Sequence, residues 1–543
     1  MSAYSKRSDG RMKRGWAWAL LMLAVVSCGR REEIPHSQQE PRLRSITIGL
    51  QTLVLPEGGS AEVPFSVKDP DFVIGPVRLQ VADGTEPSAF RLQEVVAGET
   101  PGTYKAILAD TGTETVFEEE VRLTLVQRNP DNGVESFFPS ACFTVRSENQ
   151  VEGPRVKTGL PVVYVNTEGG QGIYSKEEYV PASLSVRGKG TEYPSLQETA
   201  CFIRGRGNTT WTWPKKPYLV KMEAKTSVLG MPAHKRWVLL ANFMDRTLMR
   251  NLVSMKVSSL TSLAWTPRCV PVELVLNGEH QGSYLLIEQV RVDKHRVAIT
   301  EMTRQDNEGQ AVTGGYLLEL DFHYDNTFQW KERNIPFAVK YPDPDELTAA
   351  QKTYIKNYIA EVSNAIYGSQ FQDPGKGYAK YLDVDSFIDY WLVFEVMCNH
   401  ELGNPGSVMF HKDRGGKLTA GPCWDFDWGV LSFYTSSGDT RLVNGQAIWY
   451  ARLFQDPAFK ARVKARFEQL LPQLETIPDY MDACEQWLTQ SAQLNFAMWN
   501  PADDRSQNGG QIINGDENLS FHDAVVRLKQ NYRKHLQVIS ASL

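Results

Sequence analysis

Apolar positions recur with two different periods along this chain. In the first half, short runs such as 61–67 and 116–126 alternate apolar and polar residues. After about residue 346 the spacing lengthens, as in the series Tyr354, Tyr358, Val362 and Ile366. A period of two is typical of strands, and a period near four is typical of helices. With 543 residues the chain is long enough for about three domains, and we expect a multidomain protein with strands first and helices later.

Residues 45–147 form the first strand-rich segment. Its alternating runs are short and are separated by turn residues such as those at 56–59. This spacing predicts an all-β sandwich of the immunoglobulin or Calx-beta type. The segment has no catalytic constellation, so we expect it to act as a spacer or binding domain. The polar residues 148–159, which include Gly153-Pro154, are the expected linker to the next domain.

From residue 160 the chain again begins with strands and ends with helices. A basic glycine loop at 204–211 is followed by a strand at 216–222 that carries Lys221. Runs of apolar residues on both sides of Asn277-Gly278 predict a hairpin. A helix, a polar loop at 399–407 and another hairpin then lead to the stretch 424–429. The chain lacks the P-loop signature, which excludes a P-loop nucleotide-binding protein. It also lacks H-E-x-x-H and G-x-S-x-G, which argues against a metalloprotease and an α/β-hydrolase.

The stretch 424–429 alternates aromatic and acidic residues. On a strand, Trp424, Phe426 and Trp428 would share one face, and Asp425 and Asp427 would share the other. Two carboxylates so placed repel each other unless a cation lies between them, and Mg²⁺ prefers such oxygen ligands. The alternative is a half-buried strand with two solvated aspartates, because D-x-D alone is a weak signal.

The N-terminus is typical of a targeting segment. Basic residues precede a short apolar run at 15–26, which ends at Val25-Val26-Ser27-Cys28. This ending resembles the bacterial lipobox. The resemblance implies that residues 1–27 are a signal peptide and that Cys28 is lipidated. The protein would then be held on a bacterial membrane of the cell envelope, which we expect to be the outer membrane, in the periplasm or facing the surface, by a tether at 28–44.

Charge and cysteine content indicate which partners and metal sites are not expected. The net charge is −6 and no basic tract is present, so no nucleic-acid partner is expected. The six cysteines after Cys28 are scattered without zinc-site spacing, and we expect most of them to lie in cores.

Several motifs from about 160 to 500 together resemble the CotH family, the spore-coat-protein-H-like atypical protein kinases, with 501–543 as a helical extension of the same domain. The matching stretches are R-G-R-G-N-T-T-W at 204–211, K-K-P-Y-L-V-K at 215–221, L-G-M-P at 229–232, W-V-L-L-A-N-F-M-D-R-T-L-M-R-N at 237–251, L-N-G-E-H-Q-G-S-Y-L-L-I-E at 276–288, G-G-Y-L-L-E-L-D at 314–321 and K-D-R-G-G-K-L-T-A-G-P-C-W-D-F-D-W at 412–428. The resemblance implies an α+β protein-kinase-like fold, with ATP and Mg²⁺ (or Mn²⁺) as cofactors and a surface or secreted protein as phosphate acceptor.

The resemblance also implies roles for individual residues. Nucleotide-binding residues would be Arg204, Arg206, Asn208 and Lys221, with Glu288 paired to Lys221. Asp425 would be the first metal ligand and a catalytic residue, and Asp427 and Asn404 would be further metal ligands. For Asp245, Arg250 and Asn251, a structural ion-pair network is favoured over contact with the nucleotide.

The polar loop departs from the family pattern. Many members have N-W-D here, with the aspartate as proposed catalytic base, whereas this chain has Asn399-His400-Glu401. Glu401 is one methylene longer, and a misplacement of about 1 Å can cost about a hundredfold in rate. Three alternatives therefore stay open: a pseudokinase, a nucleotide-sugar transferase that uses the D-x-D pair, and a glycan-binding adhesin with exposed Trp211 and Trp213.

Overall fold

The computed structural model describes residues 46–68, 76–81, 85–112, 117–128, 135–148, 156–188, 191–323, 326–432, 440–501 and 514–543. The predicted signal peptide, Cys28 and the tether lie outside these residues, as does most of the predicted linker. In the part of the chain that the structure describes, no helix combines the length and the apolar character needed to cross a membrane.

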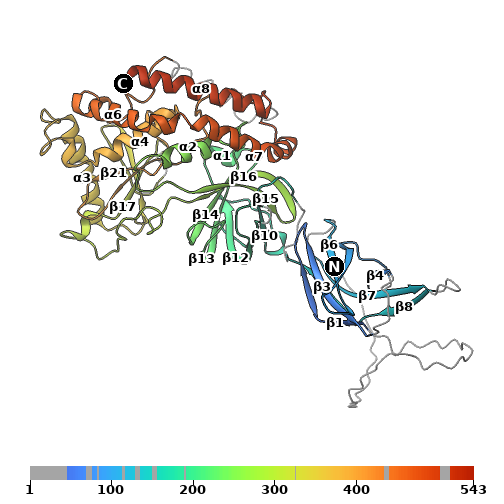
Figure 1. The fold of residues 1–543 in the computed structure, drawn as a ribbon. Helices are drawn as coiled ribbons and strands as arrows, with labels where there is room; N and C mark the ends of the chain where they lie inside the picture. Colours follow the sequence, from blue (N-terminus) through green and yellow to red (C-terminus); the bar gives the residue numbers. More distant parts are fainter. Residues whose placement is uncertain are drawn as a thin grey trace, which may run out of the picture.

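Two sheets make up the N-terminal region, drawn in blue in Figure 1. The first sheet has the order β1 (Ile46–Ile48), β3 (Ser60–Val67), β6 (Thr103–Asp110) and β5 (Phe90–Ala97). The second has the order β2 (Thr52–Leu55), β9 (Phe143–Ser147), β7 (Glu118–Arg128) and β4 (Val77–Val81), and β8 (Glu135–Pro139) pairs with β7. Both sheets contribute to one core, with Phe65 on the first and Leu123 on the second. The immunoglobulin or Calx-beta type stays a prediction.

A closed barrel follows, and its strands come from the expected second strand-rich segment. The barrel has the order β10 (Val162–Thr167), β11 (Val180–Arg187), β12 (Leu196–Gly205), β13 (Tyr218–Thr226), β14 (His234–Leu240), β16 (Glu279–Glu288) and β15 (Cys269–Leu276). The Asn277-Gly278 turn joins β15 to β16, and both residues have positive φ, which suits this residue pair. The loop between β12 and β13 contains the short helix α1 (Thr209–Thr212), and α2 (Arg250–Ser259) follows β14.

The last part packs helices around a second sheet. This sheet has the order β18 (Gln329–Glu332), β19 (Ile335–Tyr341), β17 (Tyr316–Leu320), β20 (Val408–Lys412) and β21 (Leu418–Ala420). The helices are α3 (Ala349–Tyr367), α4 (Val384–Val396), α5 (Tyr450–Leu453), α6 (Pro457–Leu474), α7 (Ile477–Met498) and α8 (Phe521–Ser542). Figure 1 shows α6, α7 and α8 together along the upper edge of the molecule, with the N-terminal sheets at the lower right.

One hydrophobic core joins the barrel to the helical part. The barrel residues Val238 and Ile287 pack in the same core as Phe387 of α4 and Phe467 of α6. The inside of the barrel has its own core, which includes Trp237. The shared core fixes the loops of the barrel against the second sheet, and the candidate site lies where they meet.

Candidate functional site

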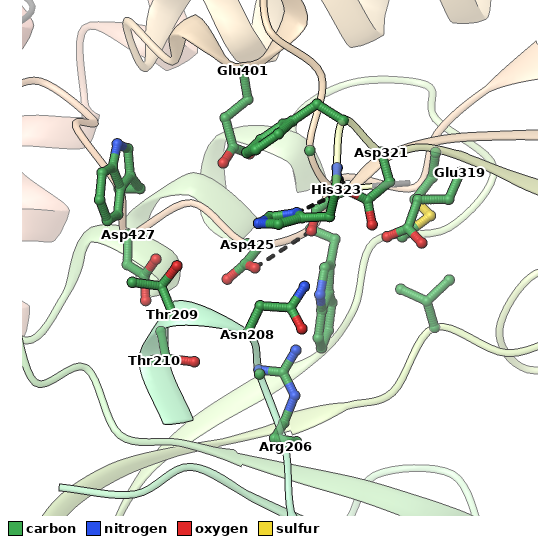
Figure 2. Close-up of a pocket in the computed structure, with 18 of the residues that line it drawn as sticks. Arg206, Asn208, Thr209, Thr210, Glu319, Asp321, His323, Glu401, Asp425 and Asp427 are labelled. Atoms are coloured by element: carbon green, nitrogen blue, oxygen red, sulfur yellow. Dashed lines mark hydrogen bonds and ion pairs between the residues drawn. The ribbon is translucent and has the colours of Figure 1, made fainter. Parts of the chain in front are cut away.

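A cavity of about 1000 Å³ lies between the β12–β13 loop, the end of β17, the 399–407 loop and the 424–429 stretch. Arg206, Asn208, Glu401, Asp425 and Asp427 all line it. Figure 2 shows their side chains directed into one space, with Asp425 and Asp427 beside each other and Asn208 approaching from the glycine loop. Asn404 also lines the cavity. Segments more than 200 residues apart in the sequence therefore meet here.

The conformation of the glycine loop requires a glycine at position 207. Gly207 has φ of +85°, and a Cβ at this position would lie 2.0 Å from the Thr210 hydroxyl. Arg206 extends across the Trp424 ring, with its guanidinium carbon 5.7 Å from the ring centroid. The tight turn thus places one cation of the loop beside the acidic stretch.

The stretch 424–428 is not a strand, and this prediction was wrong. The strand β21 ends at Ala420, and Asp425 has φ of +65°, which breaks an extended backbone. Phe426 is fully buried, whereas Trp428 is 43% exposed, so the aromatic residues do not share a buried face. The two carboxylates still reach the same cavity, but the surrounding loops position them rather than the alternation of a strand.

Hydrogen bonds from distant segments hold this acidic stretch. The backbone N–H of Phe426 donates to the Asn251 side chain at 2.8 Å. The backbone N–H of Gly429 donates to Asn514 at 3.1 Å, and the Asn514 amide donates back to the Asp427 carbonyl at 3.3 Å. Arg250 donates to the Val430 carbonyl at 2.9 Å.

The signature residues Asp245 and Arg250 form a buried ion-pair network, in line with the favoured interpretation. The Arg250 guanidinium pairs with Asp245 and, at 2.7 Å, with Asp516. All three side chains are buried, and none of them lines the cavity. Their contribution is therefore to position the acidic stretch, through Arg250 itself and through the neighbouring Asn251.

The cavity concentrates negative charge. Burial, followed by repulsion from Asp425 and Asp245, raises the pKa of Asp427 to about 8, and Arg206 opposes this shift. Burial also raises the pKa of Glu401 well above its ordinary value, and Asp425 and Asp427 add to the effect. Carboxylates held in this way have a strong tendency to bind either protons or a cation.

Glu401 lies in a short 3₁₀ helix, η4 (His400–Leu402), at the rim of the cavity. Asn399 begins this helix and accepts a hydrogen bond from the Glu401 backbone N–H at 2.9 Å. The Glu401 Oε2 atom is buried and has no hydrogen-bond partner. Burial lowers the pKa of the neighbouring His400, which favours its neutral form. A buried oxygen without a partner suits a group that meets a ligand or a proton donor.

A second acidic pair, which was not predicted from the sequence, lies in the same cavity. Glu319 and Asp321, at the end of β17, line the same cavity. Lys340 pairs with Glu319 at 2.7 Å, and His323 pairs with Asp321 at 2.9 Å. The signal was present in G-G-Y-L-L-E-L-D, where the two acids have the same spacing as Asp425 and Asp427.

Three predicted nucleotide-binding residues do not line the cavity: Arg204, Lys221 and Glu288. Glu288 is not paired with Lys221 as predicted. Its carboxylate pairs instead with Arg268 at 3.1 Å and with Arg296 at 3.8 Å, while Lys221 lies over the ring of Tyr179. The register places Lys221 opposite Arg236 and places Glu288 opposite Trp237, so the two side chains project from opposite faces of the barrel wall.

Exposure also bears on the adhesin alternative and on the cysteines. Trp213 is only 3% exposed and packs on Phe243, so it is not the exposed aromatic that this alternative needs. In the part of the chain that the structure describes, no disulfide joins the six cysteines that follow Cys28, and those at 201, 398, 423 and 484 are buried, as expected for most of them.

The donor atoms of the cavity fit a hard divalent cation only in part. Among the described residues, no three acidic, histidine or cysteine side chains are arranged to hold a metal ion by themselves. Mg²⁺ usually takes one or two carboxylates and completes its shell with phosphate oxygens and water. Asp425 and Asp427 can supply the two carboxylates, with Asn404 at the same cavity.

Comparison with known proteins gives one family. The model of the CotH kinase protein family matches residues 203–539, which is more than half of the chain. Neither the curated proteins nor the solved structures include a match. The matched segment contains every residue that lines the cavity and continues through most of α8. The chain therefore belongs to the CotH kinase family.

Proposed function

We propose that the chain is a CotH-type protein kinase that transfers the γ-phosphoryl group of ATP to a protein hydroxyl. One observation carries the proposal: the basic glycine loop, the Asp425–Asp427 pair and Glu401 converge on one cavity. Phosphoryl transfer depends mainly on positioning and on electrostatic stabilisation, and it requires these three kinds of group.

Each group has a role in this reaction. A divalent cation, when bound with ATP, would neutralise charge on the phosphates and on the two aspartates. Arg206 and Asn208 bind phosphate oxygens from the opposite wall, and Asp425 and Asp427 supply the metal ligands. Once the repulsion from these aspartates is relieved, Glu401 ionises, and its Oε2 accepts the proton of the acceptor hydroxyl. That hydroxyl oxygen bonds to the γ-phosphorus as ADP leaves.

The targeting segment gives the cellular setting of the proposal. Cleavage before Cys28 and its lipidation would place the enzyme on an envelope membrane, in the periplasm or at the surface. The acceptor would then be a surface or secreted protein. Labelling with a radioactive fatty acid that is lost in a Cys28→Ser variant tests the anchor, and retained labelling would contradict it.

A second candidate is a pseudokinase that binds ATP without transfer. The raised pKa of Glu401 favours this candidate, because a protonated carboxyl cannot accept a proton. A nucleotide-sugar transferase would use the same aspartates but would be stabilised by a nucleotide sugar and not by ATP.

Incorporation of radiolabelled phosphate from ATP by the purified protein separates these functions. We expect wild type to label itself or an added protein, and we expect Asp425→Ala and Glu401→Gln to lose most of this activity. Asp385→Asn, which changes a surface carboxylate paired with Arg462, is the matched control. ATP-dependent thermal stabilisation without any labelling supports the pseudokinase, and full labelling by Asp425→Ala overturns the site assignment.

A further inference from the structure

Four cationic side chains gather around Tyr179 on the wall of the barrel. The Tyr179 cluster consists of Tyr179, Arg204 (β12), Lys221 (β13), Arg236 (β14) and Arg291. The charged groups of Arg204, Lys221 and Arg236 lie 5.0, 5.7 and 5.6 Å from the centroid of the tyrosine ring. The strand register explains the grouping, because Lys221 is directly opposite Arg236 on the neighbouring strand.

Within the described residues, none of the four cations has a carboxylate at ion-pair distance. Arg236 donates to the Tyr179 hydroxyl, and Arg291 donates to Gln289 at 3.3 Å. The Arg204 Nε atom is buried and has no hydrogen-bond partner. One tyrosine ring cannot neutralise four positive charges, and an unpaired buried N–H is costly, so the cluster is incomplete without an anion.

The cluster continues the floor of the cavity at a distance from the carboxylates. Val238 lines the cavity, and Arg236 lies two residues before it on β14. Arg206 also lines the cavity, in the loop that follows the end of β12 at Gly205, and Arg204 is on β12 itself. Side chains two apart on a strand point to the same face. Burial lowers the pKa of Arg291, as do Arg236 and Arg204, and the acid that opposes them is Asp343 rather than a carboxylate of the cavity.

We propose that the Tyr179 cluster is a binding site for a phosphate or polyphosphate group, separate from the metal-binding carboxylates. Guanidinium groups bind phosphate oxygens through paired hydrogen bonds, and a lysine adds a point charge. The Tyr179 hydroxyl accepts from Arg236 and keeps its own O–H for donation to the anion. The phosphate belongs either to a nucleotide that extends along the cavity floor or to a second ligand.

Calorimetric titration with sodium tripolyphosphate in EDTA tests this site without the metal and without catalysis. We expect wild type and Asp425→Asn to bind tripolyphosphate equally. We expect Lys221→Gln and Arg236→Gln each to weaken binding about tenfold or more, because each variant loses one charge-assisted contact. The matched control is Lys235→Gln, because Lys235 is exposed and is adjacent to Arg236 on β14. Equal binding by wild type and both cluster variants, or no binding by wild type, overturns the proposal.

A second measurement uses only the wild-type protein, in case the variants fold poorly. Tripolyphosphate should protect Lys221, and not Lys235, from an amine-reactive label detected by mass spectrometry. Absence of this protection contradicts the site.

Excess ATP with Mg²⁺ then identifies the source of the phosphate, because displacement of tripolyphosphate assigns the site to the nucleotide and retention assigns it to a second ligand. A kinase without transfer activity would still give the EDTA result, so failures of the two proposals are distinguishable.

Discussion

Replacing Asp427 with asparagine should change how the stability of the protein depends on pH. The pKa of Asp427 rises from 3.8 in a solvated chain to about 8 in the folded protein, through burial and then repulsion from Asp425. Between these values the folded state binds more protons than the unfolded state. Stability contributed by the protonated group is therefore present at low pH and is lost as pH rises towards 8. An asparagine side chain cannot titrate, so the Asp427→Asn variant should lose less stability over this interval.

The size of the effect follows from the shift. A shift from 3.8 to about 8, at about 1.4 kcal/mol per pKa unit, sets an upper limit of about 5–6 kcal/mol on the contribution of this one group. For a folded unit of this size, 1 kcal/mol corresponds to about 1–2 °C in melting temperature, so the upper limit is about 5–12 °C. Glu401 and Glu319, whose pKa values are also raised by burial, act in the same direction and remain in the variant.

Thermal unfolding between pH 5 and 8.5 in EDTA, and again with Mg²⁺, measures the prediction. In EDTA the melting temperature of wild type should fall towards pH 8, and that of Asp427→Asn should fall less. Added Mg²⁺ should stabilise wild type more at pH 8 than at pH 5, because the cation binds the deprotonated carboxylates. Asp385→Asn, on the surface, should follow wild type. If Asp427→Asn keeps the full slope of wild type in EDTA, the reasoning about charge crowding in this cavity is wrong.

Three other changes test how the site is built. Asn514→Ala removes the side chain that bonds on both sides of the turn after Asp427 and should cost about 2–3 kcal/mol in chemical denaturation, together with most of the stabilisation by Mg²⁺. Gly207→Ala forces a Cβ against the Thr210 hydroxyl at positive φ and should cost about 1–3 kcal/mol and weaken ATP binding in calorimetry. Lys215→Met leaves three buried oxygen acceptors without their donor and should lower stability by about 3–5 kcal/mol, with the loss visible in the denaturation midpoint.

Local sequence patterns predicted the individual strands and helices better than they predicted how the strands close into a barrel. Alternation predicted strands in the first strand-rich segment, apolar runs predicted strands in the second, and the Asn277-Gly278 pair predicted its hairpin turn. The barrel was not predicted, because its closure depends on the parallel pairing of β10 with β15, which are about 110 residues apart. Periodicity reports which face of a strand is buried and does not report which strand lies beside it.

For the candidate site too, the sequence predicted which residues take part better than it predicted where their side chains point. The sequence named Arg206, Asn208, Glu401, Asp425 and Asp427, and all of them line one cavity. The family resemblance also named Lys221 as a nucleotide-binding residue, but the side-chain direction on a strand alternates, and the register directs this lysine towards Tyr179.

The family signature at 245–251 gains a physical meaning from the hydrogen bonds of the acidic stretch. Asp425 has positive φ, and backbone in this region keeps its shape only when the surroundings fix it. Asn251 binds the Phe426 N–H on one side of this residue, and Arg250 binds the Val430 carbonyl further along. Arg250 is itself held by Asp245 from the signature and by Asp516 from the segment before α8. The signature residues at 245–251 therefore contribute to the site without lining the cavity. They fix the backbone of the acidic stretch, and this backbone sets the direction in which the carboxylates of Asp425 and Asp427 point.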